Sequence, residues 1–303
     1  MTSPSETLPQ SSKRAWAMGL MVISSVGISF SGLVIRTIET TDAWQINFYR
    51  AIALIVITFL LMVWRHGIAT PDRIRGIGRP GLLAGVMLAG ASISFLQSIT
   101  NTSVANTLFM LSVIPFFTAA LARLLLKEQL TRSTVLAMCA AAIGIVVMVS
   151  GGITAGSLYG NVMGLLTALC FSCYAIIVRR HRGIEMLPAL IVSGTVVMVI
   201  ALVLRWGDLS ISLKDVLLCF LLGGLLSGLA NTLFIAASKH LVAAELTLFM
   251  LLEFALGPFW VWLFVAETPT KATVAGGAIV IGSVAIRSGL ELFHSKTRRK
   301  FSI

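Results

Sequence analysis

The apolar residues of the chain fall into ten long runs, which short polar segments separate. A helix needs about 20 apolar residues to cross a bilayer, and each run approaches that length. The first run is too long for the core of a signal peptide, so we expect an uncleaved helix there. The pattern predicts an all-α, polytopic membrane protein. Its ten transmembrane helices are predicted at about residues 15–35, 44–64, 80–99, 103–125, 132–150, 158–178, 186–204, 215–238, 241–265 and 272–290.

One stretch of the chain returns, altered, in the second half. The sequence TLFML occupies Thr107–Leu111 and recurs unchanged at Thr247–Leu251. After a one-residue deletion, Glu128 corresponds to Glu267, and the Glu-x-x-Thr segments that these residues begin also match. Together with the glycine-containing apolar span that follows each copy, these matches indicate a duplicated unit. Each copy holds five helices, an odd number, so the second copy must enter the membrane in the opposite orientation.

The duplication predicts how the chain is divided. Inverted repeats are a recurring plan of secondary transporters, whose substrate site lies between the two halves. The halves then supply two similar shapes that open to opposite sides of the membrane in turn. We expect a cytoplasmic tail at 1–14, a first five-helix repeat at 15–150, a second at 158–290, and a basic cytoplasmic tail at 291–303.

Positive charge is concentrated in alternate loops of the predicted topology. Hydrophobic residues make up 57 % of the chain and charged residues only 12 %, yet the net charge is +11. Most of the 23 lysines and arginines fall on the side of the two termini, which predicts that both termini are cytoplasmic. Because no soluble segment is long enough to form a basic module, we expect the lipid bilayer and no nucleic acid as partner. The exceptions to the bias are Arg36, Arg50, Arg205, Lys214 and Lys271.

Ionisable residues inside the spans are the first candidates for a functional site, because lipid cannot hydrogen-bond them. Apart from Asp215, the first residue of one span, only two acidic residues, Glu245 and Glu253, lie within predicted spans. Glu253 is near the middle of its span, where it can hold the amino group of a solute or carry a proton. A protonated, hydrogen-bonded structural glutamate is the alternative. Glu245 lies in a first turn and suits the positive end of its helix. Arg50 can attract a carboxylate, pair with Glu253 or extend to the headgroups.

Neutral polar and aromatic residues inside the spans form a second group of candidates. Each can line a cavity, but the polar side chains can equally join helices and the rings can simply fill space. Pro115 and Pro258 occupy roughly related places in the two repeats, and a proline can bend its helix. We expect them to act as hinges, with fixed kinks as the alternative. The remaining candidates for the cavity lining are Ser94, Gln97, Asn101, Asn106, Phe109, Tyr174, Ser227, Asn231 and Trp260.

Several short segments together resemble a known family of carriers. They are Lys127-Glu128-x-x-Thr131 after the repeated helix, Leu252-Glu253 in its second copy, and Phe48-Tyr49-Arg50-Ala51 in the second span. With the ten spans, they resemble the EamA-type ten-helix branch of the drug/metabolite transporter superfamily. The resemblance implies an inner-membrane carrier of small metabolites, and amino-acid exporters of the YddG type are among its members. The chain departs from this family where Phe254 follows Glu253, because a proline often stands there.

The sequence argues against several other classes of function. It has no G-x-x-x-x-G-K-[ST] motif for ATP, and its short loops leave no room for a nucleotide-binding domain. The interiors of the spans offer no Asp or His for catalysis, and the cysteines have no neighbouring ligands for a metal. We therefore predict a secondary transporter that exports amino acids or related small metabolites by alternating access, with protons as a candidate coupling ion and without a cofactor. Export of drug-like cations or other metabolites, and a membrane ligand receptor, are the alternatives.

Overall fold

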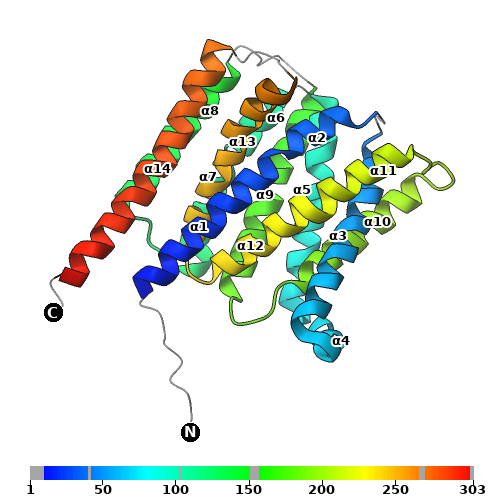
Figure 1. Cartoon of the computed structure of the whole chain (residues 1–303), viewed down its shortest axis with the longest axis horizontal. Coiled ribbons are helices and arrows are strands. Elements are labelled where there is room, and N and C mark those ends of the chain that lie inside the picture. Colours follow the sequence, from blue (N-terminus) through cyan, green and yellow to red (C-terminus); the bar gives the residue numbers. More distant parts are fainter. Residues whose placement is uncertain (1–9, 40–41, 103, 151–156, 266–269, 301–303) are drawn as a thin grey trace, which may run out of the picture.

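The computed structural model describes residues 10–39, 42–102, 104–150, 157–265 and 270–300. Regular structure in these ranges is entirely helical, without a strand. The long helices run alongside one another, and α1 begins on the same side of the bundle on which α14 ends (Figure 1). We call this side the terminal face and the other side the opposite face. Residues 1–9 of the predicted N-terminal tail and Glu267 lie outside the described residues.

The first half of the chain forms five helical rods, of which the first and the fourth are interrupted. The short η1 (Gly67–Ala69) and α4 (Thr70–Arg75) connect the second rod to the third. The rods are α1 (Gln10–Ser29) with α2 (Ser31–Thr37), α3 (Ala43–His66), α5 (Gly78–Asn101), α6 (Val104–Leu111) with α7 (Ile114–Leu121) and the π-helical η2 (Ala122–Leu126), and α8 (Arg132–Val149).

The second half repeats this plan with five further rods. Its third rod contains a π-helical segment, η3, in the middle of an otherwise α-helical span. The rods are α9 (Leu158–Arg180), α10 (Pro188–Leu204), α11 (Leu213–Phe220) with η3 (Leu221–Gly228) and α12 (Leu229–Ser238), α13 (Ala243–Val265), and α14 (Lys271–Lys300).

The rods agree with the apolar pattern of the sequence. Among the described residues, seven stretches are long and apolar enough to cross a membrane, and two shorter apolar helices cover Arg132–Met148 and Pro188–Leu204. With α14, they account for the ten predicted spans. The predicted fold class, an all-α polytopic membrane protein of two inverted five-helix repeats, is confirmed.

Some helix ends differ from the predicted ones. α1 begins at Gln10, before the first apolar run, and α14 continues to Lys300, through most of the segment predicted as a C-terminal tail. Polar residues such as Lys and Gln have good helix propensity, so a helix can continue beyond the lipid where hydropathy alone predicts an end. The first, fourth and eighth spans were each predicted as one helix, whereas the structure divides each of them.

Side-chain caps fix several helix starts. Asp42 accepts hydrogen bonds from the backbone N–H groups of Trp44 and Gln45, at 2.7 and 3.2 Å, and thereby starts α3. Thr131, Ser157 and Ser212 cap α8, α9 and α11 in the same way. Such caps satisfy N–H groups that have no partner within the helix. The caps therefore fix the residue at which each of these helices begins.

Close glycine contacts hold the rods together. The most extensive helix pairs are α5 with α9, α8 with α14 and α3 with α10. In the second of these pairs, a Cβ on Gly276 would lie 2.3 Å from the carbonyl oxygen of Gly144. Small residues permit this kind of backbone approach in membrane proteins, where packing rather than the hydrophobic effect drives helix association. The close approach of Gly144 and Gly276 sets the spacing of α8 and α14.

Candidate functional site

A central cavity of about 180 Å³ lies between the two halves of the chain. Both repeats contribute to it, the first through α1, α2, α3, α5, α6 and α7 and the second through α9, η3, α12 and α13. The volume is sufficient for several waters or a small organic solute. Glu253 lines it from the middle of α13, while Ser31 and Ile35 of α2 extend the lining toward the opposite face.

Two opposite charges line this cavity. Arg50 of α3 belongs to the first repeat and Glu253 of α13 to the second. The Nε and Nη1 atoms of Arg50 are buried and have no hydrogen-bond partner among the described residues. Glu253 makes no ion pair or hydrogen bond with the described part of the chain, so the two charges are not paired with each other. A solute that carries both signs of charge can therefore meet a complementary group in each half.

Several neutral polar side chains of the cavity lining form hydrogen bonds to backbone carbonyl oxygens of the helices. Ser24 and Ser25 of α1 donate to the carbonyl oxygens of Ala230 and Phe249, at 3.1 and 2.9 Å. These two bonds join the first repeat to α12 and α13 of the second. In α12, the Asn231 amide donates at 2.9 Å to the carbonyl of Ser227, and both of these predicted residues line the cavity.

The first rod is broken beside the cavity. α1 ends at Ser29 and α2 begins at Ser31, so only Phe30 separates them. Trp260 of α13 supports this break, because its indole N–H donates to the Ser29 hydroxyl at 2.7 Å and its ring stacks on Phe30 at 4.2 Å between centroids. Trp260 does not line the cavity, contrary to the prediction. Its ring is occupied in bracing α1 and α2.

The fourth rod is broken at Pro115, as expected for a proline inside a span. α6 ends at Leu111 and α7 begins at Ile114, and both of these residues line the cavity. The matching span of the second repeat differs, because α13 continues unbroken through position 258. The side chain of Pro258 lies outside the described residues. The hinge roles of both prolines stay predictions.

Three residues predicted for the lining, Gln97, Asn101 and Asn106, lie in a separate polar cluster at the opposite face. Asn101 donates at 2.9 Å to the backbone of Gln97, and Asn106 donates to Thr102 at 3.1 Å and to Asn161 at 3.4 Å. Because Asn161 begins the second repeat, the cluster joins the two repeats. Ser94 is buried in the same helix, α5. Of the predicted lining residues, Ser94, Gln97, Asn101 and Asn106 are not part of the cavity wall.

Two predicted aromatic residues lie behind the wall rather than in it. Tyr174 is fully buried and packs against Phe171 and Phe234, at 5.5 and 5.8 Å between ring centroids. Phe171 and Phe234 line the cavity themselves. Phe109 packs against the main apolar core. Sequence position could not separate the lining rings from the supporting ones, because it does not say which side of its helix a ring occupies.

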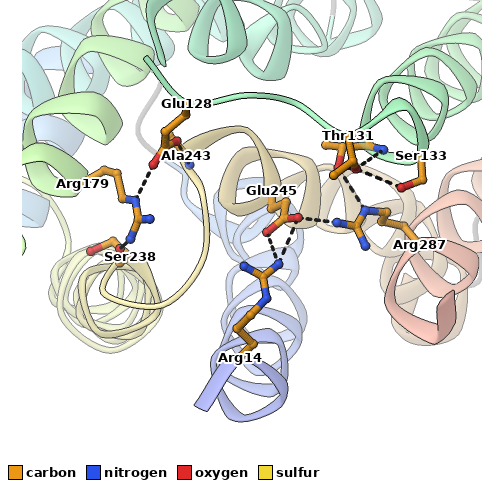
Figure 2. Close-up of polar contacts among 10 residues, drawn as sticks. Arg14, Glu128, Thr131, Ser133, Arg179, Ser238, Ala243, Glu245 and Arg287 are labelled. Carbon is orange, nitrogen blue, oxygen red and sulfur yellow. Dashed lines mark hydrogen bonds and ion pairs between the residues drawn. The ribbon is translucent and has the colours of Figure 1, made fainter. Parts of the chain in front are cut away.

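An ion-pair cluster that the sequence did not reveal lies toward the terminal face (Figure 2). Glu245, at the start of α13, accepts from Arg14 of α1 at 3.0 Å and pairs with Arg287 of α14. Arg287 also donates from Nε to the Thr134 hydroxyl at 3.1 Å. Glu245 was interpreted as a helix-end charge, yet it joins three helices from both repeats.

A second cluster is built on Glu128, at the end of the fourth rod. Glu128 accepts from Arg179 of α9 at 2.8 Å and from the backbone N–H of Ala243 at 3.1 Å. Arg179 also donates to the carbonyl of Ser238 at 2.7 Å. Lys127, with φ of 54°, turns the chain so that Glu128 can reach the second repeat. Both clusters therefore hold the terminal ends of the two halves together.

The opposite face carries more exposed ion pairs. Asp42 pairs with Arg205, and Lys214 donates to Glu39 at 2.6 Å. Exposed pairs of this kind contribute little to stability, so we expect this face to separate more easily than the terminal face. The described residues contain no cluster of His, Cys, Asp and Glu suited to a metal ion.

Known proteins share both halves of this architecture. The model of the EamA-like transporter family matches residues 15–150 and again residues 158–288. The chain belongs to this family. The two matches confirm the resemblance that rested on the Glu128 and Glu253 segments, and they identify the molecule as a transporter.

Individual relatives have low sequence identity with this chain. The pseudopaline exporter CntI of Pseudomonas aeruginosa is 26% identical over 271 residues, which are 86% of this chain and 92% of that protein. An uncharacterized transporter of Helicobacter pylori is 27% identical over 139 residues, 45% of each chain. A solved crystal structure superposes with a TM-score of 0.79 at 13% identity and covers 92% of this chain and 99% of its own. That likeness concerns the fold alone.

Proposed function

We propose that this EamA transporter is a secondary carrier that exports amino acids or related small metabolites across the bacterial inner membrane by alternating access. The observation that carries the proposal is that two ionisable residues of opposite type, Arg50 and Glu253, line one cavity from the two halves without pairing with each other. Arginine binds carboxylates through two parallel hydrogen bonds, and a carboxylate binds an ammonium group. A zwitterionic solute supplies both groups.

The surroundings favour a small organic solute over an inorganic ion. Ser24, Ser227 and Asn231 offer polar contacts, whereas Phe171 and Phe234 offer apolar ones, so the cavity suits a molecule with a charged head and an apolar part. Binding pockets for small molecules commonly combine these elements. The relative CntI, named as a pseudopaline exporter, supports export as the direction of transport.

Alternating access gives the ion-pair clusters a role. With both clusters formed, the two halves are joined at the terminal face, which we take to be cytoplasmic from the distribution of Lys and Arg. An exporter must release these contacts to load its solute from the cytoplasm. The exposed pairs at the opposite face would then separate for release into the periplasm.

Uptake of radiolabelled amino acids into proteoliposomes, with and without an imposed pH gradient, tests the proposal. We expect saturable uptake of one group of amino acids, and a proton-coupled carrier would lose its response to the gradient in Glu253→Gln. Absence of uptake for every amino acid would refute this substrate class and favour drug-like cations or other metabolites. Binding without flux, for those solutes as well, would favour a receptor.

A further inference from the structure

A small side pocket of about 20 Å³ adjoins the central cavity, with which it shares Arg50, Leu54, Ser92 and Ser227. By this measure a single water needs about 10–15 Å³, so the pocket has room for one or two water-sized groups. It suits the head group of a solute whose remainder occupies the larger cavity.

Asn47 lines the side pocket and is the most unusual residue in it. Its side chain is fully buried, and within the part of the chain that the structure describes neither its Nδ2 nor its Oδ1 atom has a hydrogen-bond partner. Asn47 and Arg50 are three residues apart in α3, so they lie on one face of the helix. The buried Nε and Nη1 atoms of Arg50 also have no partner. Four unsatisfied polar atoms therefore belong to two neighbouring residues that line one small pocket.

Native proteins rarely leave buried polar atoms without partners, and a group of them calls for a ligand. Three of these four atoms are N–H donors, and one of the two residues is cationic. The complementary group is compact, rich in acceptors and negatively charged, as a carboxylate is. The remaining acceptor, Asn47 Oδ1, can take an N–H from the same solute or from a water.

Two glycines keep this pocket free of protein side chains. A Cβ on Gly223 of η3 would lie 2.2 Å from the carbonyl oxygen of Arg50, and a Cβ on Gly194 of α10 would lie 3.0 Å from that of Ala51. Both glycines line the pocket. The neighbouring helices thus approach the backbone of α3 closely at these two glycines, beside the pocket.

We propose that Asn47 and Arg50 form a carboxylate subsite, which binds the acid group of the transported solute and selects for it. This inference rests on the proposed function for the solute, but the subsite itself can be probed with acetate alone. Asn47 would be a specificity-determining residue, and the wider cavity would hold the rest of the molecule.

The test measures the Tm of the purified full-length protein in detergent, in sodium acetate against sodium chloride at equal ionic strength. Asn47→Asp is nearly isosteric and places an anion beside Arg50, which should exclude a carboxylate. Asn47→Leu has similar volume and removes the two unsatisfied atoms, so it should fold at least as well as the native chain. Thr58→Val is the matched control, because Thr58 is a buried, unpartnered polar residue of α3 that lines neither pocket.

We expect acetate to raise the Tm of the native protein and of Thr58→Val above the chloride value. In both Asn47 variants the rise should vanish, with the apparent Kd for acetate at least about tenfold weaker, because a site built to bond one group rejects ligands poorly matched to it. Equal effects of acetate and chloride on the native protein would overturn the subsite. So would an acetate effect that persists in both Asn47 variants.

The two proposals can fail separately. An acetate effect that depends on Asn47, without uptake of any amino acid, would keep the carboxylate subsite and refute amino acids as substrates. If amino acids were taken up but the rise of Tm in acetate did not depend on Asn47, the proposed function would stand and the subsite would be refuted.

Discussion

Replacing Glu245 by glutamine should open the terminal face of the transporter. Glu245 joins Arg14 and Arg287, so its carboxylate connects α1, α13 and α14. Glutamine has nearly the same shape but no charge. It leaves Arg287 as a buried cation whose remaining partners include the Thr134 hydroxyl.

The expected free-energy cost of Glu245→Gln follows from the burial of the ion pair that it breaks. The side chains of Glu245 and Arg287 are only 7% and 8% exposed. Removing one partner of a buried pair costs about 3–5 kcal/mol, and the retained bond to Thr134 places the expected cost near the lower end, about 3 kcal/mol. If the pair exists only while the terminal face is closed, the population of the open form rises on the order of 100-fold.

Reactivity of a cysteine behind the ion pairs measures this opening. Met21 is fully buried on α1, between Arg14 and the cavity residue Ser24. Met21→Cys, in a chain without the four native cysteines, should react with a membrane-impermeant maleimide from the terminal face on the order of 100-fold faster once Glu245→Gln is added. The Tm, measured in parallel, separates opening from global unfolding.

Glu39→Gln is the control, because the same substitution there breaks an exposed pair with Lys214 at the opposite face. It should leave the reactivity of Met21→Cys unchanged. An unchanged rate in Glu245→Gln, or an equal increase in Glu39→Gln, would refute the role assigned to the buried cluster.

Three further perturbations test other parts of the structure. Gly223→Ala places a Cβ 2.2 Å from the Arg50 carbonyl oxygen and should reduce transport at least about tenfold, because it displaces Arg50. Gly19→Ala is the control and should leave transport unchanged, because the space around Gly19 is open. Uptake assays on equal amounts of folded protein compare the two variants. Arg179→Lys should lower the Tm by a few degrees. The reason is that one ammonium group cannot reproduce the geometry of the two hydrogen bonds that the guanidinium donates to Glu128 and Ser238. An unchanged Tm would contradict this prediction. Burial and the charges of Lys13, Lys239, Arg179 and Arg182 lower the pKa of His240 from its usual 6.5. Its contribution to stability is therefore present above that pH and lost as the pH falls below it, so His240→Gln should flatten the fall in Tm between about pH 7 and pH 5.

Much of the fold could be predicted from the sequence, because lipid imposes one simple rule on it. Backbone groups must be satisfied within each span, so long apolar runs have to be helices. The TLFML repeat and the odd number of helices per copy then indicate the inversion. The π-helical η3 and the break at Phe30 could not be predicted, since neither depends on a proline. They arise from contacts with other rods, as between Gly223 and Arg50 or between Trp260 and Ser29.

For the candidate site, depth along the helices could be predicted but direction around them could not. Arg50, Ser227, Asn231 and Glu253 do line one cavity, whereas Gln97 and Asn106 face the polar cluster at the opposite face. Asn47 was not predicted as a site residue, because an asparagine near the beginning of a helix also suits a helix start. Glu245 was given only a local role, since the arginines that bind it are 231 and 42 residues away in the chain.

Competition against uptake tests the central claim, a zwitterion held between Arg50 and Glu253, most directly. The competitors are the amide of the transported amino acid, which lacks the carboxylate, and the same acid without its amino group. The account predicts that both compete poorly with the native protein. Arg50→Gln should lose the preference for acid over amide, and Glu253→Gln should lose the preference for amine. If each variant kept both preferences, the two charges would not bind the solute and the account would be wrong.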